Sequence, residues 1–150
     1  MDAYPHHYKV QAAAQAEGSV TSASERLPSL STAPPLQFGG PGDQWSPETL
    51  LVAAVASCLI LTFRAVARAS KLAWLDLDCS AEGVLDRVDG VSRFTEVRLH
   101  ARLTLPAGGD IERGKHLLEK AEKTCLITNS LKAKPVLTAD VTIAAPSAPS

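Results

Sequence analysis

The sequence predicts an α+β fold in which long strands surround two main helices, and three observations predict it. A helix start at residues 46–48 opens a strongly apolar segment, residues 94–105 alternate apolar and polar side chains as a strand does, and apolar residues between 111 and 125 recur at helical spacing. The expected order is β-β-(β)-α-β-β-α-β, with the long strands antiparallel. We expect a single domain over residues 1–150, because that length suits one hydrophobic core.

The composition is that of an ordinary globular protein and argues against a highly charged partner. Hydrophobic residues make up 45% of the chain, and 15 basic and 16 acidic residues leave a net charge of -1. This balance gives no electrostatic reason to expect nucleic acid or an anionic membrane as a partner. The longest strongly apolar stretch, Leu50 to Phe63, is shorter than the roughly 20 residues that span a bilayer.

The first residues and the cysteines bear on compartment and cofactors. The start, MDAYPHHYKV, lacks the pattern of a secretory signal, and three cysteines are too few for a disulfide scaffold. We therefore expect a cytoplasmic protein. The histidines are scattered and no Cys or carboxylate cluster completes a metal site, so we expect no bound metal or cofactor.

The first elements along the chain are short. Residues 8–22 predict a weak hairpin with its turn near Glu17-Gly18, and a short strand is expected around Leu30. A Pro-, Gly- and Ser-rich stretch up to Trp45 predicts an irregular loop. The tail, about residues 147–150, is expected to be disordered.

The central helix follows this loop. Ser46 is placed to cap it, Pro47 suits its first position, and Glu48 supplies an acid in its first turn. The helix is expected to run to about Ser70. Its first half is apolar on every side, which predicts burial all round. One copy of a 150-residue chain can hardly bury such a helix, so we expect a dimer.

Two long strands, a second helix and a last strand complete the expected fold. The strands cover about residues 73–87 and 94–105, and Asp110 is placed to cap the helix that ends near Cys125. A short turn or helix, LITNSLK, then leads to a final strand, VLTADVTIAA.

The residues alone leave the role of the cysteines open. Cys58 falls in the middle of the central helix, and Cys125 falls at the apolar edge where the second helix ends. Free cysteine is among the most buried residue types, so both could simply fill the core, and their spacing does not show that the sulfurs meet. Cys79, in the strand DLDCSAE, is best interpreted as a packing residue.

Two segments carry a family resemblance. SPETLLVAAVASCL resembles the central-helix motif of the OsmC/Ohr family (osmotically inducible protein C-like, organic hydroperoxide resistance-like), in which Asn/Ser-Pro-Glu leads ten residues later to a cysteine, here Cys58. KAEKTCLITNSLK resembles the segment of the second cysteine, which a Ser/Thr-Asn pair follows closely; here Cys125 precedes Thr128-Asn129. The resemblance covers nearly the whole chain, since the order of elements also agrees.

The resemblance implies an OsmC-like fold, an intertwined homodimer and a thiol-dependent peroxidase that reduces organic hydroperoxides in oxidative stress defence. Cys58 would be the thiolate that attacks the peroxide, and its sulfenic acid would condense with Cys125 to a disulfide. An external thiol, or a dithiol such as dihydrolipoamide, would then reduce the pair.

Such chemistry requires a thiolate at neutral pH, and the family stabilises it with an arginine paired to the motif's glutamate. Glu48 matches that glutamate. No arginine matches the family pattern; Arg26 is the only arginine before the central helix and is therefore the candidate, although loop arginines are most often solvated.

Helix geometry limits what Glu48 can do. Ten helical residues put Glu48 and Cys58 roughly 15 Å apart. Glu48 would therefore have to serve Cys58 across a dimer interface, or serve only as a first-turn acid favourable to the helix dipole.

Two other functions fit the same sequence. One is a non-catalytic OsmC-like protein that binds an apolar ligand or senses redox state. The other is a purely structural dimer module. The missing arginine match is the feature that favours these alternatives.

Overall fold

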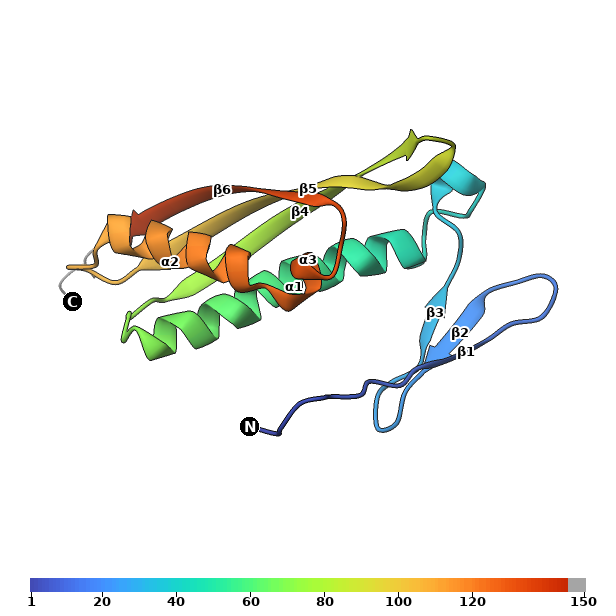
Figure 1. The fold of residues 1–150 in the computed structure, drawn as a ribbon, viewed down its shortest axis with the longest axis horizontal. Coiled ribbons are helices and arrows are strands. Elements are labelled where there is room, and N and C mark those ends of the chain that lie inside the picture. The colour runs from blue at the N-terminus through green and yellow to red at the C-terminus, as the bar shows by residue number, and fades with distance from the viewer. Residues whose placement is uncertain (146–150) are drawn as a thin grey trace. The chain divides into compact units, whose positions relative to one another are not determined.

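The computed structural model describes residues 1–145, which have the expected α+β architecture and form two compact units, one over Met1–Leu51 and one from Val52 onward (Figure 1). The expectation of one domain over residues 1–150 stays a prediction. The expected disordered tail, about residues 147–150, lies outside the described residues.

The first unit contains a small antiparallel sheet. Its strands β1 (Gln11–Ala13), β2 (Val20–Ala23) and β3 (Leu30–Thr32) pair in that order, which confirms the predicted hairpin and short strand. Gly18 lies in the first turn with a φ of 94°, a conformation that glycine adopts without steric cost. A short 3-10 helix, η1 (Leu36–Phe38), interrupts the segment predicted to be an irregular loop. Three residues are too few to produce a helical sequence period.

Helix α1 (Pro47–Ala69) begins where the sequence predicts. The backbone N–H of Thr49 donates to Ser46 Oγ at 3.1 Å, and the Ser46 N–H donates back to Thr49 Oγ1 at 2.9 Å. This is a reciprocal cap in which a threonine takes the place usually held by Glu or Gln. It satisfies N–H groups that the helix itself leaves unpaired.

Within a single chain, α1 is buried along one stripe. Its fully covered residues, Val55, Leu59, Phe63 and Ala67, recur every fourth position and form one stripe, while Leu61 on the same helix is 54% exposed. One chain buries one side of the helix only, as expected for a helix that a single copy can hardly cover, and burial on every side stays a prediction for the dimer. By length and composition alone α1 could cross a membrane, although core helices of soluble proteins meet the same criterion.

The second unit is built on a sheet of three long strands. β4 (Asp76–Val88) and β5 (Val91–Leu105) are antiparallel and joined by Asp89-Gly90, a residue pair that suits a tight hairpin turn. β6 (Lys134–Ile143) pairs with the other side of β5.

The direction of β6 corrects one expectation. It runs parallel to β5, not antiparallel. Helices α2 (Ile111–Thr124) and α3 (Leu126–Asn129) lie between the two strands in sequence and carry the chain back, which is the connection that parallel pairing requires.

The core lies between this sheet and its helices, which cover the same face (Figure 1). The predicted alternation of β5 is confirmed, because Leu99 and Leu103 are buried while Arg98 and Arg102 are exposed. At Gly83 of β4 the packing is close: an added Cβ would lie 2.8 Å from Val52 Cγ2 of α1. The close packing of α1 against the sheet therefore requires a residue without a side chain at this position.

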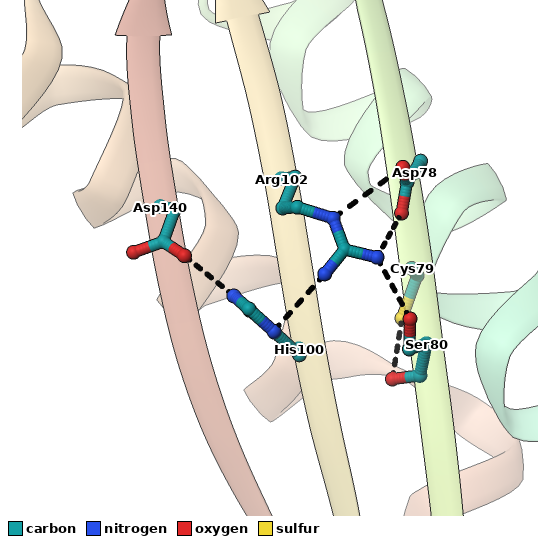
Figure 2. Close-up of polar contacts among 6 residues, drawn as sticks. All are labelled: Asp78, Cys79, Ser80, His100, Arg102 and Asp140. Atoms are coloured by element: carbon teal, nitrogen blue, oxygen red, sulfur yellow. Dashed lines mark hydrogen bonds and ion pairs between the residues drawn. The ribbon is translucent and has the colours of Figure 1, made fainter.

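The opposite face of the sheet is polar. Arg102 of β5 donates to Asp78 Oδ1 at 2.9 Å and Ser80 Oγ at 2.8 Å on β4, and to His100 Nδ1 at 3.1 Å (Figure 2). The other ring nitrogen of His100 pairs with Asp140 of β6. These exposed contacts tie the three strands together, and each is worth about 0–1 kcal/mol.

Candidate functional site

Cys58 and Cys125 come together in the second unit. Cys58 is in the middle of α1, and Cys125 is the residue between α2 and α3. Both are free thiols, and they lie close enough for each side chain to shift the pKa of the other. Their proximity is a property of the fold, because the helices that carry them are separated in sequence by the β4–β5 hairpin.

Hydrogen-bond donors surround the Cys58 sulfur. Thr62 Oγ1, one helical turn further along α1, lies 3.7 Å from Cys58 Sγ, and the backbone N–H groups of Ile127 and Leu126 face it from the start of α3. Burial raises the pKa of the Cys58 thiol, but the hydrogen bonds from Cys125, Ile127, Thr62 and Leu126 together lower it below its usual value. Cys58 is half-buried, whereas Cys125 is buried.

Cys125 has a different environment. Its side chain is buried, and the hydroxyl of Thr128, also buried, donates to Cys125 Sγ at 3.2 Å. Burial and the hydrogen bond to Cys58 raise the pKa of the Cys125 thiol, and the hydroxyl and N–H of Thr128 offset this only in part. The two thiols therefore titrate as a pair in which Cys58 carries the first negative charge.

The backbone conformation at Cys125 explains why the N–H groups of Leu126 and Ile127 lie near Cys58. Cys125 is extended, with φ -65° and ψ 112°, and it ends α2 and begins α3. A helix leaves its first N–H groups without internal partners, so those of Leu126 and Ile127 are free to donate to a neighbouring sulfur. The extended residue thus places two donors next to the thiol pair.

Cys79 is not part of this pair. It lies on β4 beside the polar network, where its Sγ contacts the Ser80 carbonyl oxygen at 3.7 Å (Figure 2). Burial, and then the charge of Asp78, raise the pKa of the Cys79 thiol to about 11, while Arg102 opposes the shift. Cys79 packs against the core, in agreement with its expected role.

The other two predicted site residues belong to the first unit. Glu48 lies in the first turn of α1, and its Oε2 atom is buried without a hydrogen-bond partner among residues 1–145. Arg26 lies in an exposed turn between β2 and β3, with a φ of 65°. Helix α1 is continuous between Glu48 and Cys58. A role for either residue at Cys58 stays a prediction.

Sequence reasoning missed the two threonines as site residues. Thr62 follows Cys58 by one helical turn, a spacing that places two side chains on one helix face and could have indicated it. Thr128 belongs to the motif that identified Cys125, but nothing in the sequence showed its hydroxyl turned toward the sulfur. Residues 1–145 contain no cluster of His, Cys, Asp and Glu that could hold a metal ion.

Comparison with known proteins matches most of the chain to one family. The family model for OsmC-like proteins matches residues 40–140. The uncharacterized protein YmaD of Bacillus subtilis (strain 168) is 28% identical over 101 residues, which cover 65% of this chain and 67% of that protein.

Solved structures show the same fold. An OsmC-like protein of unknown function from Vibrio cholerae superposes with a TM-score of 0.82 at 16% identity, covering 90% of this chain and 99% of that one. An organic hydroperoxide resistance protein from Legionella pneumophila gives 0.71 at 24%, covering 95% and 100%. One from Elizabethkingia anophelis gives 0.72 at 23%, covering 93% and 96%. At these identities the likeness concerns the fold alone.

Proposed function

The chain belongs to the OsmC-like protein family, and from that premise we propose that it is a thiol-dependent peroxidase that reduces organic hydroperoxides in oxidative stress defence. The observation that carries the proposal is that the fold brings Cys58 and Cys125 close enough to act on each other, which lowers the pKa of the Cys58 thiol and raises that of the Cys125 thiol. Two relatives of the same fold are organic hydroperoxide resistance proteins, which supports this substrate class.

The first step uses the acidity of Cys58. Its thiolate attacks one oxygen of the hydroperoxide, an S–O bond forms, the O–O bond breaks, and the alkoxide takes a proton and leaves as an alcohol. The peroxide is reduced by two electrons and Cys58 becomes a sulfenic acid. The donors around Cys58 support this step by stabilising the thiolate, which is the nucleophilic form.

The second step uses the proximity of Cys125. Its sulfur attacks the Cys58 sulfenic sulfur, an S–S bond forms, and the sulfenic oxygen leaves as water. An external thiol, or a dithiol such as dihydrolipoamide, then reduces the disulfide in two exchange steps. No bound cofactor is required, because the reductant supplies both electrons.

We place this activity in a cytoplasmic homodimer. The partly exposed apolar surface of α1 supports the dimer, because a second copy would cover it. The unpartnered buried oxygen of Glu48 supports a role toward a cation or donor from that second copy, with Arg26 as the candidate in this sequence.

The test is peroxide consumption by the reduced protein. We expect the wild type to consume cumene hydroperoxide with a dithiol present and Cys58→Ser to lose this activity, while Cys79→Ser retains it. A wild type that consumes no peroxide, or a Cys58→Ser variant as active as wild type, would contradict the proposal. In that case the chain is a non-catalytic member of the family.

The same assay tests the arginine. If Arg26 stabilises the Cys58 thiolate, Arg26→Ala lowers the rate of the first step, and Arg26→Lys restores part of it. If Arg26→Ala forms the Cys58–Cys125 disulfide at the wild-type rate, Arg26 has no place in the mechanism.

A further inference from the structure

Each thiol of the pair has its own hydroxyl. Thr62 lies beside Cys58 at 3.7 Å, and Thr128 donates to Cys125 at 3.2 Å. The peroxidase cycle proposed above gives the two sulfurs different tasks, since Cys58 attacks the peroxide and Cys125 attacks the oxidised Cys58. Two separate hydroxyls can therefore act on two separate steps.

The contact of Thr128 with Cys125 is isolated from water. Thr128 is 4% exposed and Cys125 is 1% exposed. Within the described part of the chain the Thr128 hydroxyl makes one hydrogen bond, the one to Cys125 Sγ. A buried donor that loses its acceptor is costly, so this bond persists in the native state and fixes the direction in which the hydroxyl points.

The isolation of Cys125 creates a difficulty for the resolving step. Cys125 must act as a thiolate, yet burial disfavours its charge. In the reduced pair Cys58 raises the pKa of the Cys125 thiol further, and once Cys58 is oxidised to a neutral sulfenic acid the burial of Cys125 still disfavours its thiolate. What remains to offset the burial of Cys125 is Thr128, through its hydroxyl and its N–H.

We propose that Thr128 is a positioning residue for the resolving step: its hydroxyl holds the Cys125 sulfur and stabilises it as a thiolate while it attacks the Cys58 sulfenic acid. This inference rests on the proposed peroxidase function and assigns Thr128 to one half of the cycle. Thr62 then serves the first half, through Cys58.

The Cys125 thiol gives up its proton, its sulfur forms a bond to the Cys58 sulfur, and the S–O bond of the sulfenic acid breaks. The departing hydroxide takes up a proton and leaves as water. The hydroxyl of Thr128 keeps its own proton throughout, since it acts only as a hydrogen-bond donor.

Two valine variants separate the roles of the hydroxyls. Valine replaces the hydroxyl of threonine by a methyl group of similar size. In Thr128→Val we expect Cys58 sulfenic acid to form within about twofold of the wild-type rate and the disulfide to form about tenfold more slowly, the scale of one lost hydrogen bond. In Thr62→Val we expect the reverse: slower reaction with peroxide and normal disulfide closure.

The readout is rapid quenching after one equivalent of cumene hydroperoxide, with dimedone trapping of sulfenic acid and mass spectrometry of the disulfide. Thr128→Val should accumulate the dimedone adduct and, with excess peroxide, the Cys58 sulfinic acid. Thr128→Ser restores the hydroxyl and should restore the rate of disulfide formation. A structural role of the side-chain shape alone would not produce this rescue.

Diamide, an azo oxidant, tests the inference apart from the peroxidase function. It adds to the Cys58 thiolate, and Cys125 then displaces the hydrazine to form the disulfide. Slow closure in Thr128→Val with diamide supports the inference even if wild type reduces no peroxide. Should Thr128→Val fail to fold, Thr128→Ala against Thr128→Ser is the same comparison. Disulfide formation at the wild-type rate in the folded valine or alanine variant, or no rescue by serine, overturns it.

Discussion

At the scale of residues, the two thiols of the pair differ in acidity, because hydrogen bonds lower the pKa of Cys58 while burial raises that of Cys125. Cys58 receives hydrogen bonds from Cys125, from the backbone of Ile127 and Leu126, and from Thr62. Cys125 is buried, and its interaction with Cys58 raises the pKa of its own thiol. Within one chain these hydrogen bonds lower the pKa of Cys58, and no arginine is among their donors.

A prediction follows for Cys125→Ala. This change removes the largest of the hydrogen bonds that lower the pKa of Cys58, so that pKa should rise. In wild type the alkylation of Cys58 by iodoacetamide, followed against pH by mass spectrometry, should have its midpoint below that of an ordinary cysteine. An unchanged midpoint in Cys125→Ala would show that the hydrogen bond between the thiols has no influence.

Cys79 should be alkylated only at high pH, in contrast to Cys58. With its pKa raised to about 11, it is almost entirely protonated near pH 8 and resists alkylation there. We expect its labelling to begin only as the pH approaches its pKa, while Cys58 in the same sample is labelled at a lower pH. Labelling of Cys79 ahead of Cys58 at pH 7 would contradict the assignment of the two environments.

The two cysteines of the candidate site could be predicted from the sequence. The threonines that contact them, Thr62 and Thr128, could not. Short motifs identified Cys58 and Cys125, because each motif is local in sequence. The contact of Thr128 with Cys125 depends on the extended backbone at Cys125, which ends one helix and begins another. No local pattern of residues predicts that the helix is interrupted at Cys125.

At the scale of elements, helix α1 lies close to β4 at Gly83. A Cβ there would lie 2.7 Å from Phe94 Cε1 and 2.8 Å from Val52 Cγ2. Gly83→Ala should therefore destabilise the protein by about 1–3 kcal/mol, the usual range for overpacking.

A double-mutant cycle checks the cause. Val52→Ala removes one of the two obstructing side chains, so Gly83→Ala should cost less stability in the Val52→Ala background. Urea unfolding of the four proteins gives the coupling. Additive effects of the two changes would mean that α1 does not press on this part of β4.

The elements themselves were largely predictable. Capping residues at Ser46 and Asp110 and the alternation within β5 are local signals, and the structure bears them out. The direction of β6 was not predictable in this way, because the antiparallel expectation overlooked that α2 and α3 form a crossover between β5 and β6.

At the scale of the whole molecule, much of the apolar surface of α1 is exposed to solvent in a single chain. Only 22% of the residues in its most apolar 18-residue window are buried. We expect a homodimer, with a mass near twice the 15.8 kDa of the chain by light scattering.

A pair of variants tests whether α1 forms the interface. Leu61, 54% exposed on α1, should be needed for association, so Leu61→Lys should shift the protein toward monomer. Leu85→Lys is the matched control, because Leu85 is 41% exposed but lies on β4. A Leu61→Lys protein that is as dimeric as wild type would exclude this face as the interface.

The central claim, that Cys58 and Cys125 form one redox site, has a direct test. Reduced protein is treated with one equivalent of cumene hydroperoxide per chain, alkylated, digested without reductant and mapped by mass spectrometry. We predict a Cys58–Cys125 disulfide as the main product, with Cys79 alkylated only after denaturation. A disulfide that involves Cys79, or two unreacted thiols at Cys58 and Cys125, would contradict it.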